Sequence, residues 1–199
     1  MSRVFIIRHG AVDNPSDRLY GQLPGYHLSE LGKAQAQEAG VFMSRIPLDF
    51  IIASSLERAQ ETAQIIADLH PAHPPIITDS RLVDADFGKY SGVISVQEFE
   101  GNRDHYWQLQ LAGEDGMESP AAVLGRMRSA LIDHSSAHQD KNILFVSHGD
   151  PIALLLEDTW QQPSAPGSAV DYPKKASIFE IDLAAGQAHN IFTPTGSTF

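Results

Sequence analysis

The sequence of 199 residues contains no cysteine. This excludes disulfide bonds, cysteine-ligated zinc, iron–sulfur clusters and a thiolate nucleophile, so any covalent catalysis must use another side chain. Basic residues are scarce too, with 14 Lys and Arg against 25 Asp and Glu, for a formal net charge of −11. Such an excess of negative charge repels nucleic acid and anionic membranes, and we expect neither as a partner. Small anions can bind only where basic residues gather.

Long apolar runs are also absent. The first apolar run covers only residues 4–7, which is too short for a signal peptide or a membrane span, so we expect a cytoplasmic protein. A chain of 199 residues can bury about 70% of the surface that it exposes when unfolded, enough for a core without disulfides or a structural metal. We expect residues 1–199 to form a single domain, and the sequence leaves its oligomeric state open.

Short runs rich in β-branched and aromatic residues predict strands. Two of them are continuously apolar, at residues 4–7 and at residues 143–146 of the predicted strand 143–147, which is typical of central strands covered on both faces. Helical patterns lie between the runs, and this alternation predicts an α/β sandwich with a largely parallel sheet. The other predicted strands are at 50–53, 75–78, 178–183 and 188–192.

Apolar residues spaced three and four apart predict helices between these strands. Ser29 and Ser119 stand at the N-cap positions of two helices, and Pro120 follows in a first turn, where its missing N–H costs nothing. Ser54 and Glu57 form a capping-box pattern, which predicts that another helix opens at Ser54.

Two further segments have no strand pattern. Residues 87–118 are richer in Gly, charged and aromatic residues, and we interpret them as an excursion over the sheet that serves as a lid or pocket wall. Within this excursion, residues 96–107 have a helical pattern. Residues 163–168, rich in Pro, Gly and Ser, predict a surface loop.

His-Gly pairs follow two of the predicted strands. Arg8-His9-Gly10 ends the first strand, and His148-Gly149 ends the strand at 143–147. Ligand sites form at the carboxyl ends of parallel strands, so we expect both imidazoles in one pocket. Each glycine removes a side chain next to a histidine and lets a ligand approach the backbone closely.

Arginine and aspartate are predicted at the same edge. Arg58 falls in the first turn of a helix, which is unfavourable for the helix dipole but suits an anion. Together with Arg8 it could bind a dianionic phosphoryl group through guanidinium groups that match the phosphate oxygens. Asp84 and Asp86 follow the strand at 75–78 and could each deliver a carboxylic acid to this edge.

These residue types together suit phosphoryl transfer. An imidazole can attack phosphorus to form a phosphohistidine, while arginines and a second imidazole stabilise charge on the phosphoryl oxygens. A carboxylic acid can protonate the departing alkoxide and then activate water. The arrangement requires no metal or other cofactor.

Each feature alone has a structural explanation. A His after a strand is usually structural or exposed, Arg58 could be a surface helix charge, and either Asp could be a turn residue beside Gly88. His134 and His138 are four residues apart but lack the Glu of a zinc-protease helix. The joint occurrence of the elements in one order is what favours phosphoryl chemistry.

Five motifs in this order resemble the histidine phosphatase superfamily, in its phosphoglycerate mutase-like branch. The resemblance covers nearly the whole chain and implies a three-layer α/β/α fold with metal-independent catalysis. It implies that His9 is the phosphorylated nucleophile, and that Arg8, Arg58 and His148 surround the phosphoryl group. The motifs are Arg8-His9-Gly10, residues 28–36, residues 54–63, residues 82–92 and residues 146–149.

The sequence departs from the family pattern at several positions. Asp84 stands where the family commonly has a Glu proton donor, so its carboxyl is one methylene shorter; Asp86 is the alternative donor. Val12 replaces a hydroxyl residue. Asn14 stands one residue earlier than the family's Asn, and we carry it over as a substrate-binding residue together with Gly149.

The sequence therefore predicts a histidine acid-type phosphatase, a phosphoric monoester hydrolase that acts on a small phosphorylated metabolite through a phosphohistidine at His9. One alternative is an isomerase of the phosphoglycerate mutase type, although the compact length favours hydrolysis. A second alternative is a non-catalytic protein that binds a phosphorylated ligand, which the replacement of Glu by Asp84 would support.

Overall fold

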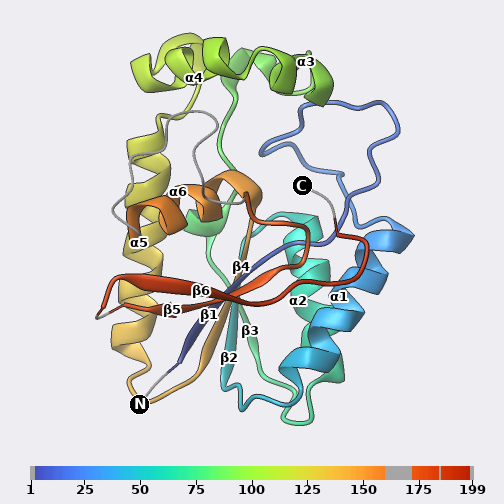
Figure 1. Cartoon of the computed structure of the whole chain (residues 1–199), viewed down its shortest axis with the longest axis vertical. Coiled ribbons are helices and arrows are strands. Elements are labelled where there is room, and N and C mark those ends of the chain that lie inside the picture. The colour runs from blue at the N-terminus through green and yellow to red at the C-terminus, as the bar shows by residue number, and fades with distance from the viewer. Residues whose placement is uncertain (1–2, 160–171, 184, 198–199) are drawn as a thin grey trace.

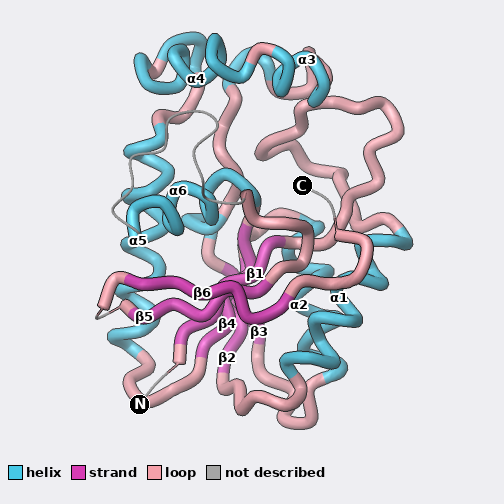
Figure 2. The backbone as a smooth tube through the Cα atoms, viewed as in Figure 1, coloured by secondary structure: helices cyan, strands magenta, loops and turns pink. Residues whose placement is uncertain are grey.

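A mixed sheet forms the centre of the molecule (Figures 1 and 2). The computed structural model describes residues 3–159, 172–183 and 185–197. Within these residues six strands lie in the order β3-β2-β4-β1-β5-β6. The first four in this order run parallel, whereas β5 is antiparallel to both β1 and β6. The strands are β1 (Val4–Arg8), β2 (Phe50–Ala53), β3 (Ile76–Thr78), β4 (Ile143–Ser147), β5 (Ile178–Asp182) and β6 (Gln187–Phe192).

Helices cover both faces of the sheet, as Figure 1 shows. Helices α1 (Glu30–Met43) and α2 (Glu57–Leu69) lie on one face, and α5 (Pro120–Ala137) and α6 (Gly149–Thr159) on the other. Alternate β1 side chains enter two separate cores: Phe5 faces α1 and α2, whereas Ile6 faces α5 and α6. Both are fully buried, because a strand covered on two faces needs apolar residues on both. The predicted three-layer α/β/α sandwich is confirmed.

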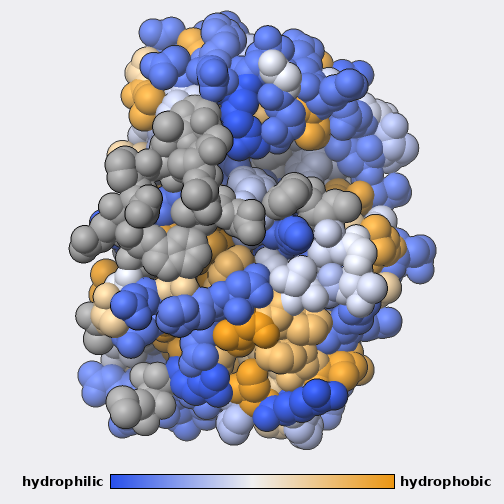
Figure 3. Space-filling view, in the orientation of Figure 1, coloured by the Kyte–Doolittle hydropathy of each residue, from blue (hydrophilic) through white to orange (hydrophobic). Residues whose placement is uncertain are grey.

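The segment between β3 and α5 lies beyond the carboxyl ends of the parallel strands, at the top of Figure 1. It contains α3 (Val96–Gly101) and α4 (Arg103–Ala112), which meet at a non-helical Asn102. The predicted helical stretch at 96–107 is therefore two helices. A third apolar cluster, which includes Phe87, Phe99 and Tyr106, packs beneath them. The outer surface of α3 and α4 is largely hydrophilic (Figure 3).

Two of the three predicted helix caps are confirmed. Ser29 accepts a hydrogen bond from Gly32 N at 3.1 Å, and Ser119 accepts one from Ala122 N at 3.2 Å. The capping box at Ser54 is wrong, because α2 begins at Glu57 with no side-chain cap. The Ser54 hydroxyl is engaged elsewhere, as described below. The loop predicted at 163–168 lies outside the described residues.

Two glycines let α1 approach the turn that follows β1. A Cβ atom on Gly10 would lie 2.3 Å from the carbonyl oxygen of Gly32, and a Cβ atom on Gly32 would lie 1.9 Å from the carbonyl oxygen of Ala11. Side-chain atoms cannot be accommodated at such distances. The backbone that follows His9 is thus packed tightly against the first turn of α1.

Candidate active site

The two predicted histidines meet at the carboxyl edge of the sheet. β1 and β4 are parallel neighbours in which Arg8 pairs with Ser147, so the next residue of each strand is a histidine. The rings of His9 and His148 have centroids 5.0 Å apart, and both side chains are buried. The two imidazoles expected in one pocket are therefore neighbours, but only His9 is among the described residues that line the cavity reported below.

Backbone and arginine contacts orient the His9 ring. Its Nδ1 lies 2.7 Å from the carbonyl oxygen of Gly10, which can only accept, so Nδ1 carries the proton. The other nitrogen, Nε2, is then free to accept, and Arg58 Nε lies 3.3 Å from it. Burial, together with the positive charges of Lys175, Arg58 and Arg8, holds the pKa of His9 well below its usual value. His9 is therefore a neutral imidazole with a lone pair on Nε2.

Arg58 connects the nucleophile candidate to the acid candidate. It comes from the first turn of α2 and is fully buried. One terminal nitrogen donates to the carbonyl oxygen of Gly21 at 2.6 Å and to Asp84 Oδ2 at 3.3 Å. Its guanidinium carbon lies 4.8 Å from the centre of the Tyr20 ring. These contacts fix the guanidinium group beside His9 and Asp84 at the same time.

Several donors at this edge are not used within the described part of the protein. Arg8 donates from Nη1 to the carbonyl oxygen of Pro173 at 2.7 Å, but its Nε has no hydrogen-bond partner there. Arg58 Nη1 and His148 Nδ1 likewise have none. Buried polar groups are normally satisfied, so three such nitrogens around one histidine suit an anion with several oxygens.

His148 is held by a serine. Its Nε2 lies 2.7 Å from the hydroxyl of Ser54, which explains why that serine does not cap α2. Burial and nearby arginines hold the pKa of His148 well below its usual value. Its Nδ1 lies 3.8 Å from Asp84 Oδ2, so His148 contacts both the serine after β2 and the carboxyl group.

Asp84 is the carboxyl group at this site. Burial raises its pKa, an effect that the nearby Arg58 opposes and the charge of Asp150 reinforces. A raised pKa keeps the carboxylic acid protonated to higher pH, as a proton donor requires. Asp86 is placed differently, since its Oδ1 accepts from Gly88 N at 2.8 Å in a local turn. The geometry therefore favours Asp84 over Asp86.

Arg126 on α5 holds the backbone that carries Asp84. Its guanidinium group donates to the carbonyl oxygens of Arg81, Val83 and Asp84 at 2.7, 2.6 and 2.8 Å. It also pairs with Glu118, with Nε 2.8 Å from Oε1. Sequence reasoning missed this role, because nothing near residue 126 indicates a partner more than 40 positions away.

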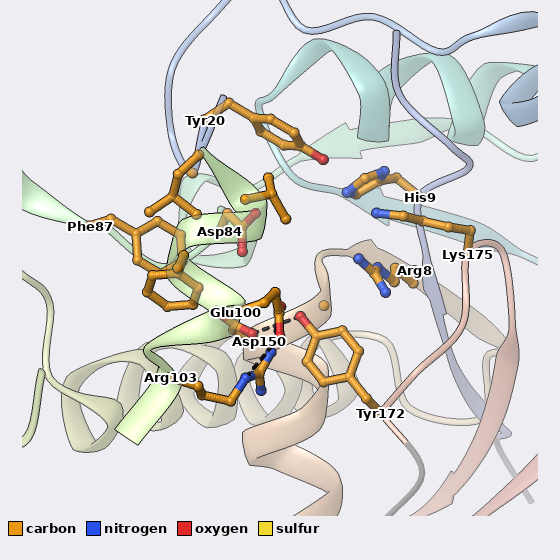
Figure 4. A pocket seen from close by; sticks show the side chains of 15 residues that line it. Arg8, His9, Tyr20, Asp84, Phe87, Glu100, Arg103, Asp150, Tyr172 and Lys175 are labelled. Carbon is orange, nitrogen blue, oxygen red and sulfur yellow. Dashed lines mark hydrogen bonds and ion pairs between the residues drawn. The ribbon is translucent and has the colours of Figure 1, made fainter. Parts of the chain in front are cut away.

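A cavity of about 560 Å³ opens next to these residues. Arg8, His9, Asp84 and Gly149 line it, and Figure 4 shows Lys175 reaching alongside His9 and Arg8. Sequence reasoning also missed Lys175, which lies in the turn just before β5 and belongs to none of the motifs. The only signal for it was its place next to a strand that pairs with β1.

Of the two further residues predicted to bind substrate, Gly149 and Asn14, only Gly149 lines the cavity. A Cβ atom on Gly149 would lie 2.1 Å from the hydroxyl oxygen of Tyr172, so a larger residue would displace the end of that side chain. Asn14 is not brought to the cavity. Its amide donates to the carbonyl oxygen of Arg18 at 2.9 Å and its side-chain oxygen accepts from Arg18 N at 3.0 Å, so it closes a surface turn.

No group of three or more His, Asp or Glu side chains among the described residues converges in a way that could hold a metal ion. No helix within the described ranges is long and apolar enough to cross a membrane.

The fold and the site define a class: an α/β protein that presents two histidines, two arginines and a carboxyl group at one sheet edge. Residues 4–191 match the family model of the histidine phosphatase superfamily (branch 1). The chain therefore belongs to this superfamily, and the resemblance drawn from the motifs is confirmed.

The names of individual relatives refer to different activities. The chain is 30% identical to "Phosphoserine phosphatase 1" of Hydrogenobacter thermophilus, over 78% of this chain and 74% of that protein. It is 31% identical to "Probable phosphoglycerate mutase GpmB" of Yersinia enterocolitica, over 95% of both. A solved mycobacterial glucosyl-3-phosphoglycerate phosphatase with VO3 is 27% identical, covers 96% of this chain and 97% of its own, and superimposes with a TM-score of 0.77.

Proposed function

We propose that this protein is a metal-independent phosphatase that hydrolyses the phosphate monoester of a small metabolite through a phosphohistidine at His9. The observation that carries the proposal is the orientation of His9, whose Nε2 is unprotonated and beside Arg58 while its Nδ1 is held by Gly10. Arg8, Arg58 and His148 then take the role of phosphoryl-binding residues. The cavity of about 560 Å³ is of the size that small-molecule sites have.

The first step transfers the phosphoryl group to the protein. The lone pair of His9 Nε2 attacks phosphorus, and the bond from phosphorus to the ester oxygen breaks with its electron pair on that oxygen. The departing oxygen takes the proton of Asp84, whose raised pKa keeps it in the acid form. Arg8, Arg58 and His148 stabilise the charge on the three phosphoryl oxygens during transfer.

The second step regenerates the protein. A water molecule gives a proton to the Asp84 carboxylate as its oxygen attacks phosphorus. The bond from phosphorus to Nε2 breaks, its electron pair returns to the imidazole, and inorganic phosphate leaves. Lys175 lies alongside His9 (Figure 4) and in its protonated form adds a further positive charge there. A bound dianion would in turn raise the depressed pKa of Lys175.

The segment at 87–118 is part of this proposal. Its residues Phe87, Val96, Phe99, Glu100 and Arg103 line the cavity. Of these, Phe87, Glu100 and Arg103 lie on the side away from His9 (Figure 4). We infer that this segment forms the wall against which the leaving group lies, as expected of an excursion over the sheet.

Phosphohistidine formation is tested directly by quenching the protein with 32P-labelled substrate. We expect acid-labile, base-stable label on the protein and steady release of phosphate from 4-nitrophenyl phosphate in excess EDTA. The His9→Ala variant should lose both, whereas the exposed His189→Ala variant should retain both. Activity that survives in His9→Ala would reject the proposed nucleophile and favour the non-catalytic binding protein with a contaminating phosphatase.

A phosphoglycerate mutase remains the second candidate, because a relative with that name is 31% identical. Chain length does not separate the two, since this chain covers 95% of that relative. Incubation with 3-phosphoglycerate does separate them. Formation of 2-phosphoglycerate without free phosphate would establish the mutase, and phosphate release without isomer would establish the phosphatase.

A further inference from the structure

The cavity has two ends with opposite electrostatic character (Figure 4). Arg8 and Lys175 lie at the His9 end. The other end contains two carboxylates, Glu100 and Asp150, and one cation, Arg103. Since the phosphoryl dianion compensates the cations beside His9, the leaving group meets a local charge of about −1 at the other end, where one cation faces two anions.

The single cation at this end is already engaged. Arg103 donates from Nε and Nη2 to the two carboxylate oxygens of Glu100, at 3.1 and 2.7 Å. Its guanidinium carbon also lies 5.7 Å from the centre of the Tyr172 ring. This bidentate pair uses the Nε–Nη2 edge, so a substrate carboxylate could reach only the Nη1 side of a guanidinium group whose charge Glu100 already balances.

Asp150 has acceptor capacity left over. It lies in the first turn of α6, and one of its oxygens accepts from the hydroxyl of Tyr172 at 2.7 Å. A carboxylate can accept several hydrogen bonds, so its remaining lone pairs can receive a donor from a bound molecule. The cavity therefore offers an acceptor where many phosphorylated acids would need a donor.

The residues that are not described between α6 and Tyr172 cannot supply a further cation. Residues 160–171, which are not described, contain no Lys, Arg or His, and their only charged residue is Asp171. Apolar side chains, among them Leu19, Phe87 and Phe99, make up the neighbouring wall. They suit the carbon skeleton of a leaving group and add no charge.

We propose that this end of the cavity selects phosphate esters whose alcohol has no carboxylate and carries a hydroxyl or ammonium donor for Asp150. The proposal rests on the phosphatase function above, and it adds the substrate class. Esters of amino alcohols and polyols fit it. Phosphoserine and 3-phosphoglycerate do not, because each brings a carboxylate against Glu100 and Asp150.

Matched substrate pairs test this selection. Phosphoethanolamine and phosphoserine differ only by a carboxylate, and glycerol 3-phosphate carries a hydroxymethyl group where 3-phosphoglycerate has a carboxylate. We expect kcat/KM to be about tenfold higher for the member of each pair that has no carboxylate, which corresponds to about 1.4 kcal/mol. A ratio of one or below in both pairs would overturn the proposal.

Charge variants identify the residues responsible. Glu100→Gln and Asp150→Asn should each lower the ratio to about threefold or less, because each removes one repulsive charge, whereas Arg103→Gln should raise it. The control Asp68→Asn removes an equal charge from the exposed end of α2 and should leave the ratio unchanged. If all four variants give the same ratio of kcat/KM values, the selection does not come from Glu100, Asp150 and Arg103.

The outcome can be separated from failure of the phosphatase proposal. Turnover of 4-nitrophenyl phosphate reports the chemistry at His9, and it is measured in every variant. If no ester is hydrolysed, the phosphatase proposal fails, and calorimetric dissociation constants of the four esters with the intact protein then decide the selection. Tighter binding of the two esters without carboxylate supports it, and equal or weaker binding overturns it.

Discussion

Two clusters of charged residues in this protein differ in how completely their arginine nitrogens are hydrogen-bonded. At the surface, Arg81 donates from all three of its side-chain nitrogens to Asp79, Ser129 and Asp133. Beside the cavity, Arg8 and Arg58 each have one buried nitrogen without a hydrogen-bond partner among the described residues, and they lie around His9 together with Lys175.

The pKa values reflect this difference. Hydrogen bonds from Arg81 hold the pKa of Asp79 at about 2, so its ionised form is stabilised by its neighbours. Burial instead raises the pKa of Asp84 and lowers those of His9 and Lys175, so their charged forms are destabilised. The Arg81 cluster contributes to stability, whereas the arrangement around His9 supports the proposed binding of a ligand that brings its own negative charge.

The largest loss of activity should come from replacing Arg58, which belongs to the cluster around His9. We expect Arg58→Leu to lower kcat/KM for a phosphate ester by about 10²- to 10³-fold, the range seen when one preorganised donor to a transition state is lost. Steady-state kinetics with an alkyl phosphate measures this. The exposed Arg45→Leu should change kcat/KM less than twofold; comparable losses in both would contradict the role of Arg58.

Asp84→Asn should cause the second-largest loss of activity. We expect a loss of about 10²-fold on an alkyl phosphate and a much smaller loss on 4-nitrophenyl phosphate, whose leaving group needs no proton. Because the active form has Asp84 protonated, kcat/KM of the unmodified protein should fall as pH rises through the raised pKa of this group. The variant should lack that alkaline limb. Asp86→Asn is the control. If the two variants lose activity equally, the assignment of Asp84 as the proton donor is contradicted.

Lys175→Met should have a moderate effect. We expect about a tenfold loss in kcat/KM, together with a shift of the acid limb of the pH profile to higher pH. The sign follows from the charge: Lys175 lowers the pKa of His9, so its removal raises that pKa, and neutral His9 then appears at higher pH. A pH profile from 4 to 8 checks this. An unshifted limb would show that Lys175 does not act on His9.

Asp79→Asn should have the smallest effect on activity and a measurable one on stability. A carboxylate with a folded-state pKa of about 2 contributes about 1–2 kcal/mol to the free energy of unfolding at pH 7. Since this pKa is depressed, the contribution is complete above the unfolded-state value and disappears as pH falls towards 2. Urea unfolding at pH 7 and pH 3 should show a difference between variant and parent that shrinks at the lower pH, with kcat/KM unchanged.

Local patterns were enough to predict the elements and the centre of the site. Continuous apolar runs indicated β1 and β4, and a histidine directly after each run is placed by the parallel register of the two strands. This part of the site is determined by backbone pairing, which leaves a strong signal in the sequence.

Long-range side-chain contacts left no such signal. Arg126 acts through backbone carbonyls in another segment, and any residue can supply a carbonyl. Lys175 approaches His9 through a turn that no motif marks. Ser54 matched a capping box by type and spacing, yet its hydroxyl contacts His148, because a tertiary partner competes with the local backbone. Sequence patterns therefore predict where the site is but miss which residues support it.

The carbonyl oxygen of Gly10, which holds the His9 ring, differs in kind from the carboxylates that orient many histidines. It has no pKa in the accessible range, so no change of pH can release the ring. It also belongs to the backbone, and no side-chain replacement can delete it. A point mutation can remove the Arg58 contact on Nε2 of this proposed nucleophile, but it can disturb the Gly10 contact on Nδ1 only by moving the main chain between β1 and α1.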